Sequence, residues 1–574
     1  MTPSNVPAQA RQSSHHLRRL KHSNRTRRPA FEHLEDRRVM AVDFASAFAV
    51  GGVASESVWD LALDGAGNTC VVGRFFGTTD FDPSAGTYEL TSTPSGTGNT
   101  FAAKYAPDGS LLWAQRLGGN NANSGPEIAA GSDGSVYVVG SFENTAEIGS
   151  FTLTSLGDDD AYVTKLDADG NIVWAKSFGG TGDDWGNGVA VDGVGNVYMM
   201  VETRSAATTL PLDAFIAKMD EAGIVQWTTA IGASTAAAPA KGKPAPTGHV
   251  RGFKITVDAA GSVYATGSMQ GTVDFDASAG ATKLSGDAFV MKLSSGGSLT
   301  WARTFVSLSI GSGIWPSDIT VDGSGNVYST GSYSLTNDFD PGTAKSQKYT
   351  LDAGVSASGV WNRGAYISAL DASGNFLWAK STQSVGGNGY LAVPEAMTLD
   401  GQGGIYVAGT FSSYGTFSSG IVDFDSGAGT FSLTSAGGDD AFVWNLDTSG
   451  NFVWAGQMAG TGADRARGIG VDAAGNIYVA GSFTGTVDFD PGAGTYNLTS
   501  AGGSDFFVAK LTQPVALALT ASQPQSNSLL LATTPSRRLS SKAADSALAA
   551  RGDDGSTGWD DSLDDELLLV LASV

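Results

Sequence analysis

The chain has 574 residues, a formal net charge of −23 and one cysteine, Cys70. Nucleic-acid binding is not expected of so acidic a chain, because contacts to phosphates need a concentration of Lys and Arg. A single cysteine excludes an intrachain disulfide. No apolar run reaches the ~18 residues of a membrane-spanning helix, so no transmembrane segment is expected.

Residues 1–41 are basic and lack hydrophobic periodicity, which predicts a segment that is disordered or removed. Residues 1–40 hold nine Lys/Arg against three Asp/Glu. The stretch Arg28-Pro-Ala-Phe-Glu-His-Leu-Glu-Asp-Arg-Arg-Val-Met-Ala41 resembles the F-E-x-L-E-x-R-x-L-L-A segment that opens many planctomycete exported and surface proteins. That resemblance implies export, with cleavage near Met40 or Ala41 and an extracellular or cell-surface location.

From residue 42 the chain repeats itself. The core Asp-x-x-Gly-(Asn/Ser/Gly)-x-Tyr, with a Cys in place of the Tyr in the first copy, recurs at spacings of about 61 to 78 residues. Copies begin at Asp64, Asp192, Asp258, Asp322, Asp400 and Asp472, with a weaker copy at Gly131. A long fixed period decides the architecture before any single motif does.

Each copy divides into four expected strands, A to D. In the copy around Asp192, strand A is Val189-Ala-Val-Asp192 and strand B is Asn196-Val-Tyr-Met-Met200. Strand C is typified by Asp160-Ala-Tyr-Val-Thr-Lys-Leu166 and strand D by Asn171-Ile-Val-Trp-Ala-Lys-Ser-Phe178. The Asp-x-x-Gly segments between A and B, and between C and D, predict tight turns, since Asp caps its own turn and Gly accepts a positive φ.

One four-stranded sheet per copy predicts an all-β, seven-bladed β-propeller with four-stranded blades. The last copy stops after strand C, at Asp505–Leu511, whereas residues 43–52 look like an orphan strand D. We therefore expect the N-terminal strand to complete the last blade and close the ring, which removes two open sheet edges. In this alignment Phe44-Ala45 takes the place of the Trp-Ala pair found in the other copies.

The repeats carry a family resemblance. The pattern D-A-F-V-x-K-L-D-x-x-G-N-x-x-W-A-x-x-x-G-G, followed by I-A-V-D-x-x-G-N-V-Y-V-x-G-S-F, is similar to the SBBP-type β-propeller repeat of bacterial exported proteins. The resemblance covers residues 42–512 and implies a fold rather than an activity. Residues 513–574 are low in complexity and end in an acidic stretch, which predicts a mostly disordered tail.

Turn chemistry leaves one recurring motif partly unexplained, the Asp-Phe-Asp between strands B and C. Residues i and i+2 of an extended chain point to one face, so the two carboxylates repel unless they are solvated, hydrogen-bonded or bridged by a cation. Oxygen ligands favour Ca²⁺, although capped turns also account for the pattern. The candidate metal ligands are Asp80, Asp82, Asp274, Asp276, Asp338, Asp340, Asp423, Asp425, Asp488 and Asp490.

Antiparallel strands place the A–B and C–D turns at one end of the blades and the B–C and D–A loops at the other. The second set is longer and acidic, as in Asp158-Asp159-Asp160 and Asp439-Asp440, so partner binding is expected there. Removing residues 1–41 leaves His249 as the last histidine, which disfavours histidine-based catalysis and zinc. The sequence thus favours a monomeric, noncatalytic surface module that binds a surface protein or an envelope polysaccharide. A carbohydrate-active enzyme that uses Asp carboxylates is the alternative.

Overall fold

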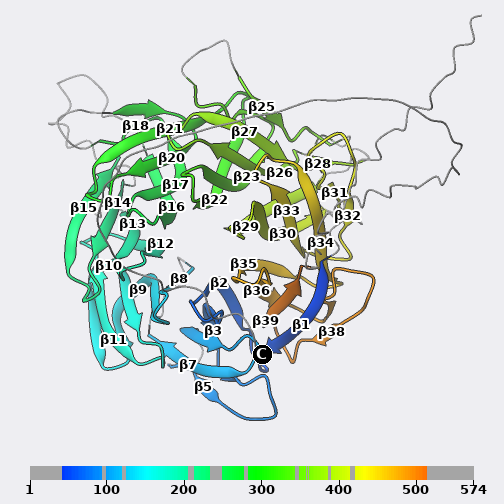
Figure 1. Cartoon of the computed structure of the whole chain (residues 1–574). Coiled ribbons are helices and arrows are strands. Elements are labelled where there is room, and N and C mark those ends of the chain that lie inside the picture. Colours follow the sequence, from blue (N-terminus) through cyan, green and yellow to red (C-terminus); the bar gives the residue numbers. More distant parts are fainter. Residues whose placement is uncertain are drawn as a thin grey trace, which may run out of the picture. The chain divides into compact units, whose positions relative to one another are not determined.

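The computed structural model describes residues 42–513 except 94–97, 119–124, 204–212, 233–248, 277–281, 343–347, 357–358, 360, 386–389 and 414–419. The N-terminal basic segment, most of the C-terminal tail and the Ala/Pro/Lys insertion at 233–247 therefore lie outside the described residues. Within the described part every regular element is a β-strand, and none is a helix that could cross a bilayer. The all-β propeller class is thus confirmed, and Figure 1 shows its sheets following one another around a common centre.

Four antiparallel strands form each repeat unit, and the chain visits them in order. The first unit consists of β2 (Ser57–Leu63), β3 (Thr69–Phe75), β6 (Asn99–Tyr105) and β7 (Leu111–Leu117). The second consists of β8 (Glu127–Ala130), β9 (Val136–Ile148), β10 (Phe151–Leu166) and β11 (Ile172–Phe178). The third consists of β12 (Asp184–Val191), β13 (Val197–Thr203), β14 (Asp213–Met219) and β15 (Val225–Ile231).

The later units have the same plan. The fourth consists of β16 (His249–Val257), β17 (Val263–Gln270), β20 (Ala288–Leu293) and β21 (Leu299–Ser307). The fifth consists of β22 (Gly313–Val321), β23 (Val327–Ser334), β26 (Arg363–Leu370) and β27 (Phe376–Ser381). The sixth consists of β29 (Tyr390–Leu399), β30 (Gly404–Ser413), β33 (Asp440–Asp447) and β34 (Phe452–Gly460). The last consists of β35 (Arg465–Val471), β36 (Ile477–Phe483), β39 (Asp505–Thr512) and β1 (Asp43–Val50).

Short hairpins extend the connections between the second and third strands of five units. They are β4 (Thr78–Asp80) with β5 (Glu89–Thr91), β18 (Thr272–Asp274) with β19 (Lys283–Ser285), β24 (Thr336–Asp338) with β25 (Thr350–Asp352), β31 (Ile421–Asp423) with β32 (Ser432–Thr434), and β37 (Thr486–Asp488) with β38 (Asn497–Thr499). The short strand β28 (Gln383–Ser384) pairs with β31.

The seven expected blades do not form seven separate sheets, because some units are joined into larger sheets. Four sheets have four strands each, whereas one has six and one has ten. The hairpin strands cause part of this merging, because β24 pairs with β21 and β37 pairs with β34 across the unit boundary. A single parallel pair, Arg363 with Leu391, joins the fifth and sixth units as well.

The N-terminal strand β1 pairs antiparallel with β39, from Asp43 opposite Thr512 to Val50 opposite Phe506. The predicted register needs a correction. A bulge between Phe44 and Ser46 places Ser46, not Phe44, opposite Lys510, as Trp113 lies opposite Lys104 in the first unit. Phe44 contacts Tyr496 instead, with ring centroids 4.7 Å apart. The same bulge recurs in the fourth strand of every other unit, so the backbone of β1 follows the common plan. The predicted alignment was displaced by two residues because β1 has no Trp to mark the position.

The Asp-x-x-Gly segments form the predicted turns. Asp472 Oδ1 accepts the amides of Ala474 and Asn476, each at 2.9 Å, and Gly475 has φ of 83°. Asp472 Oδ2 accepts the Asn476 side-chain amide at 2.7 Å and the buried Tyr478 hydroxyl at 3.2 Å. In the five units that have both the Asp and the Tyr, the motif therefore ties the turn to the core of its own unit.

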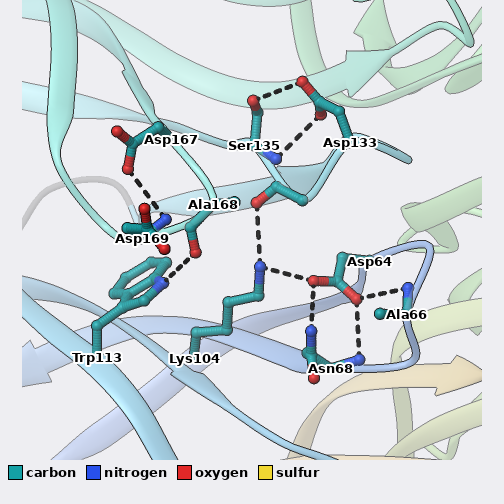
Figure 2. Close-up of polar contacts among 11 residues, drawn as sticks. Asp64, Ala66, Asn68, Lys104, Trp113, Asp133, Ser135, Asp167, Ala168 and Asp169 are labelled. Carbon is teal, nitrogen blue, oxygen red and sulfur yellow. Dashed lines mark hydrogen bonds and ion pairs between the residues drawn. The ribbon is translucent and has the colours of Figure 1, made fainter.

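The repeated Trp of the fourth strand links neighbouring units. Its indole nitrogen donates to a carbonyl in the turn between the third and fourth strands of the next unit, as Trp113 does to Ala168 at 3.0 Å (Figure 2). The same bond joins Trp174 to Glu221, Trp227 to Ser295, Trp301 to Ala372 and Trp378 to Thr448. Apolar clusters also extend across the boundaries, so burial and hydrogen bonding hold the units together.

Candidate binding pocket at the loop end of the inner strands

The first strand of each unit, here called the inner strand, contacts the inner strand of the next unit. The inner strands are β2, β8, β12, β16, β22, β29 and β35, and β35 also contacts β2. Their N-terminal ends surround a cavity of about 430 Å³. It therefore lies at the end of the units that carries the longer B–C and D–A loops, where function was expected.

Alternation along the inner strands explains which side chains reach this pocket. Residues two apart in a strand share a face. Trp185, Arg251, Trp315 and Val393 lie seven residues before the Asp of the following turn, and Trp59, Asn187, Phe253, Ser317, Glu395 and Arg467 lie five residues before it. The two positions supply most of the lining, and their variation among units gives one pocket many kinds of side chain.

Aromatic rings form a large part of the wall. Trp315 is 41 % exposed, and the guanidinium of Arg363 lies 4.4 Å from its ring centroid. The guanidinium of Arg467 lies 5.1 Å from the Trp59 ring. Trp185 donates its indole N–H to Asp159 at 3.1 Å, whereas the buried indole nitrogen of Trp59 has no hydrogen-bond partner. The pocket thus offers aromatic rings, and guanidinium groups lie over two of them.

The expected acidity of this end does not extend to the pocket. Its lining holds Arg251, Lys254, Arg363 and Arg467 beside Glu127, Glu202 and Glu395. Most of these charges are paired between units: Arg251 and Arg467 pair with acids of the preceding unit, whereas Lys254 of the fourth unit reaches acids of the first and second units. Arg251 lies 3.3 Å from Glu202, Arg467 lies 3.3 Å from Glu395, and Lys254 contacts Glu127 and Asp60.

Carboxylates at the base of the pocket hold the inner strands in place. Asp60 Oδ2 accepts the amide of Ile128 in the second unit at 3.1 Å. Asp318 Oδ2 accepts the amide of Met397 in the sixth unit at 2.6 Å. Desolvation raises the pKa of Asp318 to about 6, and it also raises the pKa of Glu395. The pocket therefore has a rigid hydrogen-bonded base and one carboxyl in its wall with a raised pKa.

The Asp-Phe-Asp motifs lie elsewhere, in the short hairpins. Their central rings, Phe81, Phe275, Phe339, Phe424 and Phe489, are completely buried. The first Asp caps its loop: Asp488 Oδ1 accepts the amides of Asp490 at 3.1 Å and Tyr496 at 2.8 Å. The second Asp caps the following turn, as Asp490 does for Gly492 at 2.8 Å.

The other hairpins repeat this arrangement. Asp80, Asp274, Asp338 and Asp423 each accept the amide two residues on, from Asp82, Asp276, Asp340 and Asp425. Asp82, Asp340 and Asp425 in turn accept the amides of Ser84, Gly342 and Gly427. In the described part of the chain no group of three or more His, Cys, Asp or Glu side chains is placed to hold a metal. Each candidate pair is thus engaged in turn capping.

The aromatic and charged pocket residues were not singled out from the sequence. The available signal was the presence of Trp59, Trp185 and Trp315 five or seven residues before the turn Asp, at positions where the other units vary widely. Without the strand register, these positions could not be distinguished from core aromatics.

Residues 173–203 match the family model of the SBBP β-propeller repeat. The predicted resemblance is therefore confirmed for this stretch, which runs from the fourth strand of the second unit to the second strand of the third. A WD repeat-containing protein of Acanthamoeba polyphaga mimivirus is 26 % identical over 159 residues, which are 24 % of this chain and 11 % of that protein. The regulatory protein FlaEY of Caulobacter vibrioides is 32 % identical over 106 residues, 18 % of this chain and 11 % of that protein.

Solved structures also resemble the chain. A Dyadobacter fermentans protein of unknown function has a TM-score of 0.34 and 10 % identity, covering 82 % of this chain and 99 % of its own. The WD40 domain of Neurospora crassa Pan2 has a TM-score of 0.35 and 9 % identity, covering 81 % of this chain and 97 % of its own. The matched segments span about a tenth of each curated relative. A β-propeller of this WD-repeat-like kind is consistent with a binding or scaffold module.

Proposed function

We propose that this chain is an exported, noncatalytic binding module, a closed seven-bladed propeller that holds its partner in the pocket at the loop end. Seven four-strand units, the pairing of β1 with β39 and the contact of β35 with β2 support the closed ring. Closure matters for function because the pocket takes residues from both the first and the last units, Trp59 and Arg467 among them.

The partner that this pocket fits best is an envelope polysaccharide. Sugar rings present flat C–H faces that pack on exposed aromatic rings, and their hydroxyls need closely spaced donors and acceptors. Trp315 supplies a half-exposed ring, while Arg363, Glu202 and Asn187 supply donors and acceptors around it. The carrying observation is this combination of three tryptophans with paired charges in one cavity.

The location rests on the sequence of residues 28–41, whose planctomycete-type pattern implies export. A module that binds envelope glycan has its ligand outside the cytoplasm, so the proposed partner and the proposed location agree. Secretion of a reporter fused to residues 1–60, and its loss when residues 28–41 are removed, would test this part by itself.

A glycan-cleaving enzyme is the second candidate, and one observation favours it. Glu395 is a pocket carboxyl whose pKa is raised by desolvation, which is a property of general acids in glycoside hydrolysis. Glu395→Gln separates the two functions. If the chain is a binding module, neither the wild type nor the variant forms product above the blank. If the chain is an enzyme, the wild type cleaves the glycan and the variant does not.

The binding proposal is tested with envelope polysaccharide fragments on an array. Trp315→Ala should weaken binding by about 10-fold or more, because aromatic anchors dominate binding energy. Trp361→Ala is the matched control, since Trp361 is 51 % exposed and is not part of the pocket lining. The pocket is not the site if the two variants bind equally well. It is also rejected if both variants stay folded and both lose binding.

A further inference from the structure

Three boundaries between neighbouring repeat units contain a pair of buried carboxyl groups. In each pair one acid lies in the third strand of a unit and the other at the start of the next inner strand. The pairs, here called the junction pairs, are Asp160 with Asp184, Asp440 with Asp464, and Asp505 with Glu56. The two acids of each pair contact the same glycine or two successive glycines, which are Gly179 and Gly180, Gly460, and Gly51 and Gly52. All six side chains belong to residues that are at most 4 % exposed.

No Lys or Arg among the described residues lies within ion-pair distance of these six acids. Three other buried or partly buried acids do have a basic partner: Asp64 lies 2.6 Å from Lys104, Glu202 lies 3.3 Å from Arg251, and Asp60 lies 3.4 Å from Lys254. Two buried carboxylates without a cation are strongly disfavoured, since desolvation and mutual repulsion add. The junction pairs therefore lack the partner that the rest of the fold supplies.

One carboxyl oxygen in each junction pair is also without a hydrogen bond. These atoms are Asp160 Oδ1, Asp464 Oδ2 and Asp505 Oδ1. The other oxygens of the same three carboxyls accept backbone amides, from Leu156 at 3.2 Å, Thr484 at 3.3 Å and Ala501 at 2.9 Å. Each of the three boundaries thus has one unpaired buried oxygen, on the third-strand acid in two of them and on the inner-strand acid in the other. An unpaired buried carboxyl oxygen points to a ligand that completes the set.

Glycines let these carboxyls pack directly against the backbone. A Cβ at Gly460 would lie 2.6 Å from the Thr486 carbonyl oxygen and 3.0 Å from Asp464 Oδ2. A Cβ at Gly52 would lie 3.2 Å from the Thr78 carbonyl oxygen and 3.9 Å from Glu56 Oε1. At Gly51 and Gly179 a Cβ would collide with the carboxyls of Asp505 and Asp160. Carboxylate oxygens therefore lie against glycine backbone at all three boundaries, and at Gly460 and Gly52 a backbone carbonyl oxygen lies beside the same glycine.

We propose that each junction pair binds one divalent cation of the calcium type, which links two neighbouring units. Carboxylate and carbonyl oxygens are the ligands that Ca²⁺ prefers, and water completes the coordination that two acids cannot supply. In the cation-free chain, desolvation and the neighbouring acids raise the pKa of Asp184 to about 6 and that of Asp464 to about 7. A bound cation removes this cost and stabilises the boundary.

The test is calorimetric titration of the EGTA-treated full-length chain with CaCl₂ at pH 7.5. We expect three equivalents of Ca²⁺ to bind and the melting temperature to rise with calcium. Asp464→Asn and Asp505→Asn should each remove one equivalent, and the double variant should remove two. The matched control is Asp488→Asn with Asp490→Asn, which changes a hairpin of the same unit and should retain all three.

The wild-type stoichiometry keeps the proposal testable even if a variant fails to fold. The absence of Ca²⁺ binding to the wild type at millimolar concentration would overturn the proposal, as would loss of calcium only in the Asp488/Asp490 variant. In the first case, each pair would share a proton instead. These outcomes are independent of the glycan array, because removing one boundary cation leaves the tryptophans of the pocket unchanged.

Discussion

Lys104 Nζ lies 2.6 Å from Asp64 Oδ2 and also donates to the Gly134 carbonyl at 3.0 Å (Figure 2). In other units the equivalent Asp oxygen accepts a tyrosine hydroxyl, as Asp192 does from Tyr198 at 3.0 Å. Cys70 occupies the tyrosine position in the first unit, and Lys104 supplies the missing donor. Lys104 also bonds to the turn of the second unit, so it links two units, whereas the tyrosine bond lies within one unit.

Lys104→Met should therefore destabilise the fold strongly. Removing one partner of a buried ion pair leaves an uncompensated charge and costs about 3–5 kcal/mol. Urea denaturation measures the change. Lys510→Met is the matched control, because Lys510 has the same place in the last unit but lies over the Tyr478 ring at 5.1 Å. A loss below about 1 kcal/mol for Lys104→Met, or an equal loss for both, would contradict this assignment.

The same pair predicts a pH dependence. Burial opposes ionisation of Asp64, but hydrogen bonds from Lys104 and Asn68 hold its pKa below the usual value. A carboxyl with a lowered folded-state pKa stabilises the fold above its unfolded pKa, near 4, and loses that contribution as the pH falls further. Stability of the wild type relative to Asp64→Asn should thus be constant from pH 7 to 5 and decline below pH 4. A constant difference down to pH 2 would exclude this linkage.

When EGTA removes calcium, the junction pairs predict the opposite pH dependence, with stability falling as the pH rises. Desolvation raises the folded-state pKa of Asp464 to about 7, so its protonated form favours folding at low pH. That contribution is present below its unfolded pKa near 4 and is lost as the pH rises to about 7. Asp464→Asn should flatten this part of the stability profile. If the profile of the variant falls as steeply as that of the wild type between pH 4 and 7, Asp464 is not its source.

Deleting residues 42–50 should expose the edge of β39. That strand pairs with β1 on one side and β36 on the other, so the deletion leaves its backbone groups unpaired. We expect a lower melting temperature and association of chains through the free edge, measured by calorimetry and light scattering. A monomeric variant with unchanged unfolding would show that β1 does not complete the last unit.

The sequence was sufficient for the strands and turns, because Asp472, Gly475 and Tyr478 encode one local structure that recurs in nearly every unit. It also indicated which strand completes the last unit. It did not reveal that Ser46 rather than Phe44 takes the Trp position, because β1 has no Trp to mark it. It also did not reveal the merging of sheets through Arg363 and Leu391, which depends on a contact between distant segments. The pocket was missed for the same reason: Arg363 and Trp315 meet only when the strands are paired.

The Asp-Phe-Asp motif shows how a correct observation can support two explanations. The spacing does place carboxylates near one another, and the hairpins show Asp488 and Asp490 accepting backbone amides. Asp488→Ala should cost about 0.5–1.5 kcal/mol, because the amides of Asp490 and Tyr496 lose their acceptor. If calcium raises the melting temperature of the wild type but not of this single variant, the hairpins rather than the junction pairs hold the ion.

The central claim is that the pocket binds glycan without cleaving it. The most direct measurement is titration of the full-length chain with the best-binding polysaccharide fragment, followed by mass analysis of that fragment after prolonged incubation. We predict saturable binding that Trp315→Ala weakens about 10-fold or more and that Trp361→Ala leaves unchanged. The mass of the fragment should be unchanged after the incubation. A shortened fragment, or binding that is insensitive to Trp315, would contradict the account.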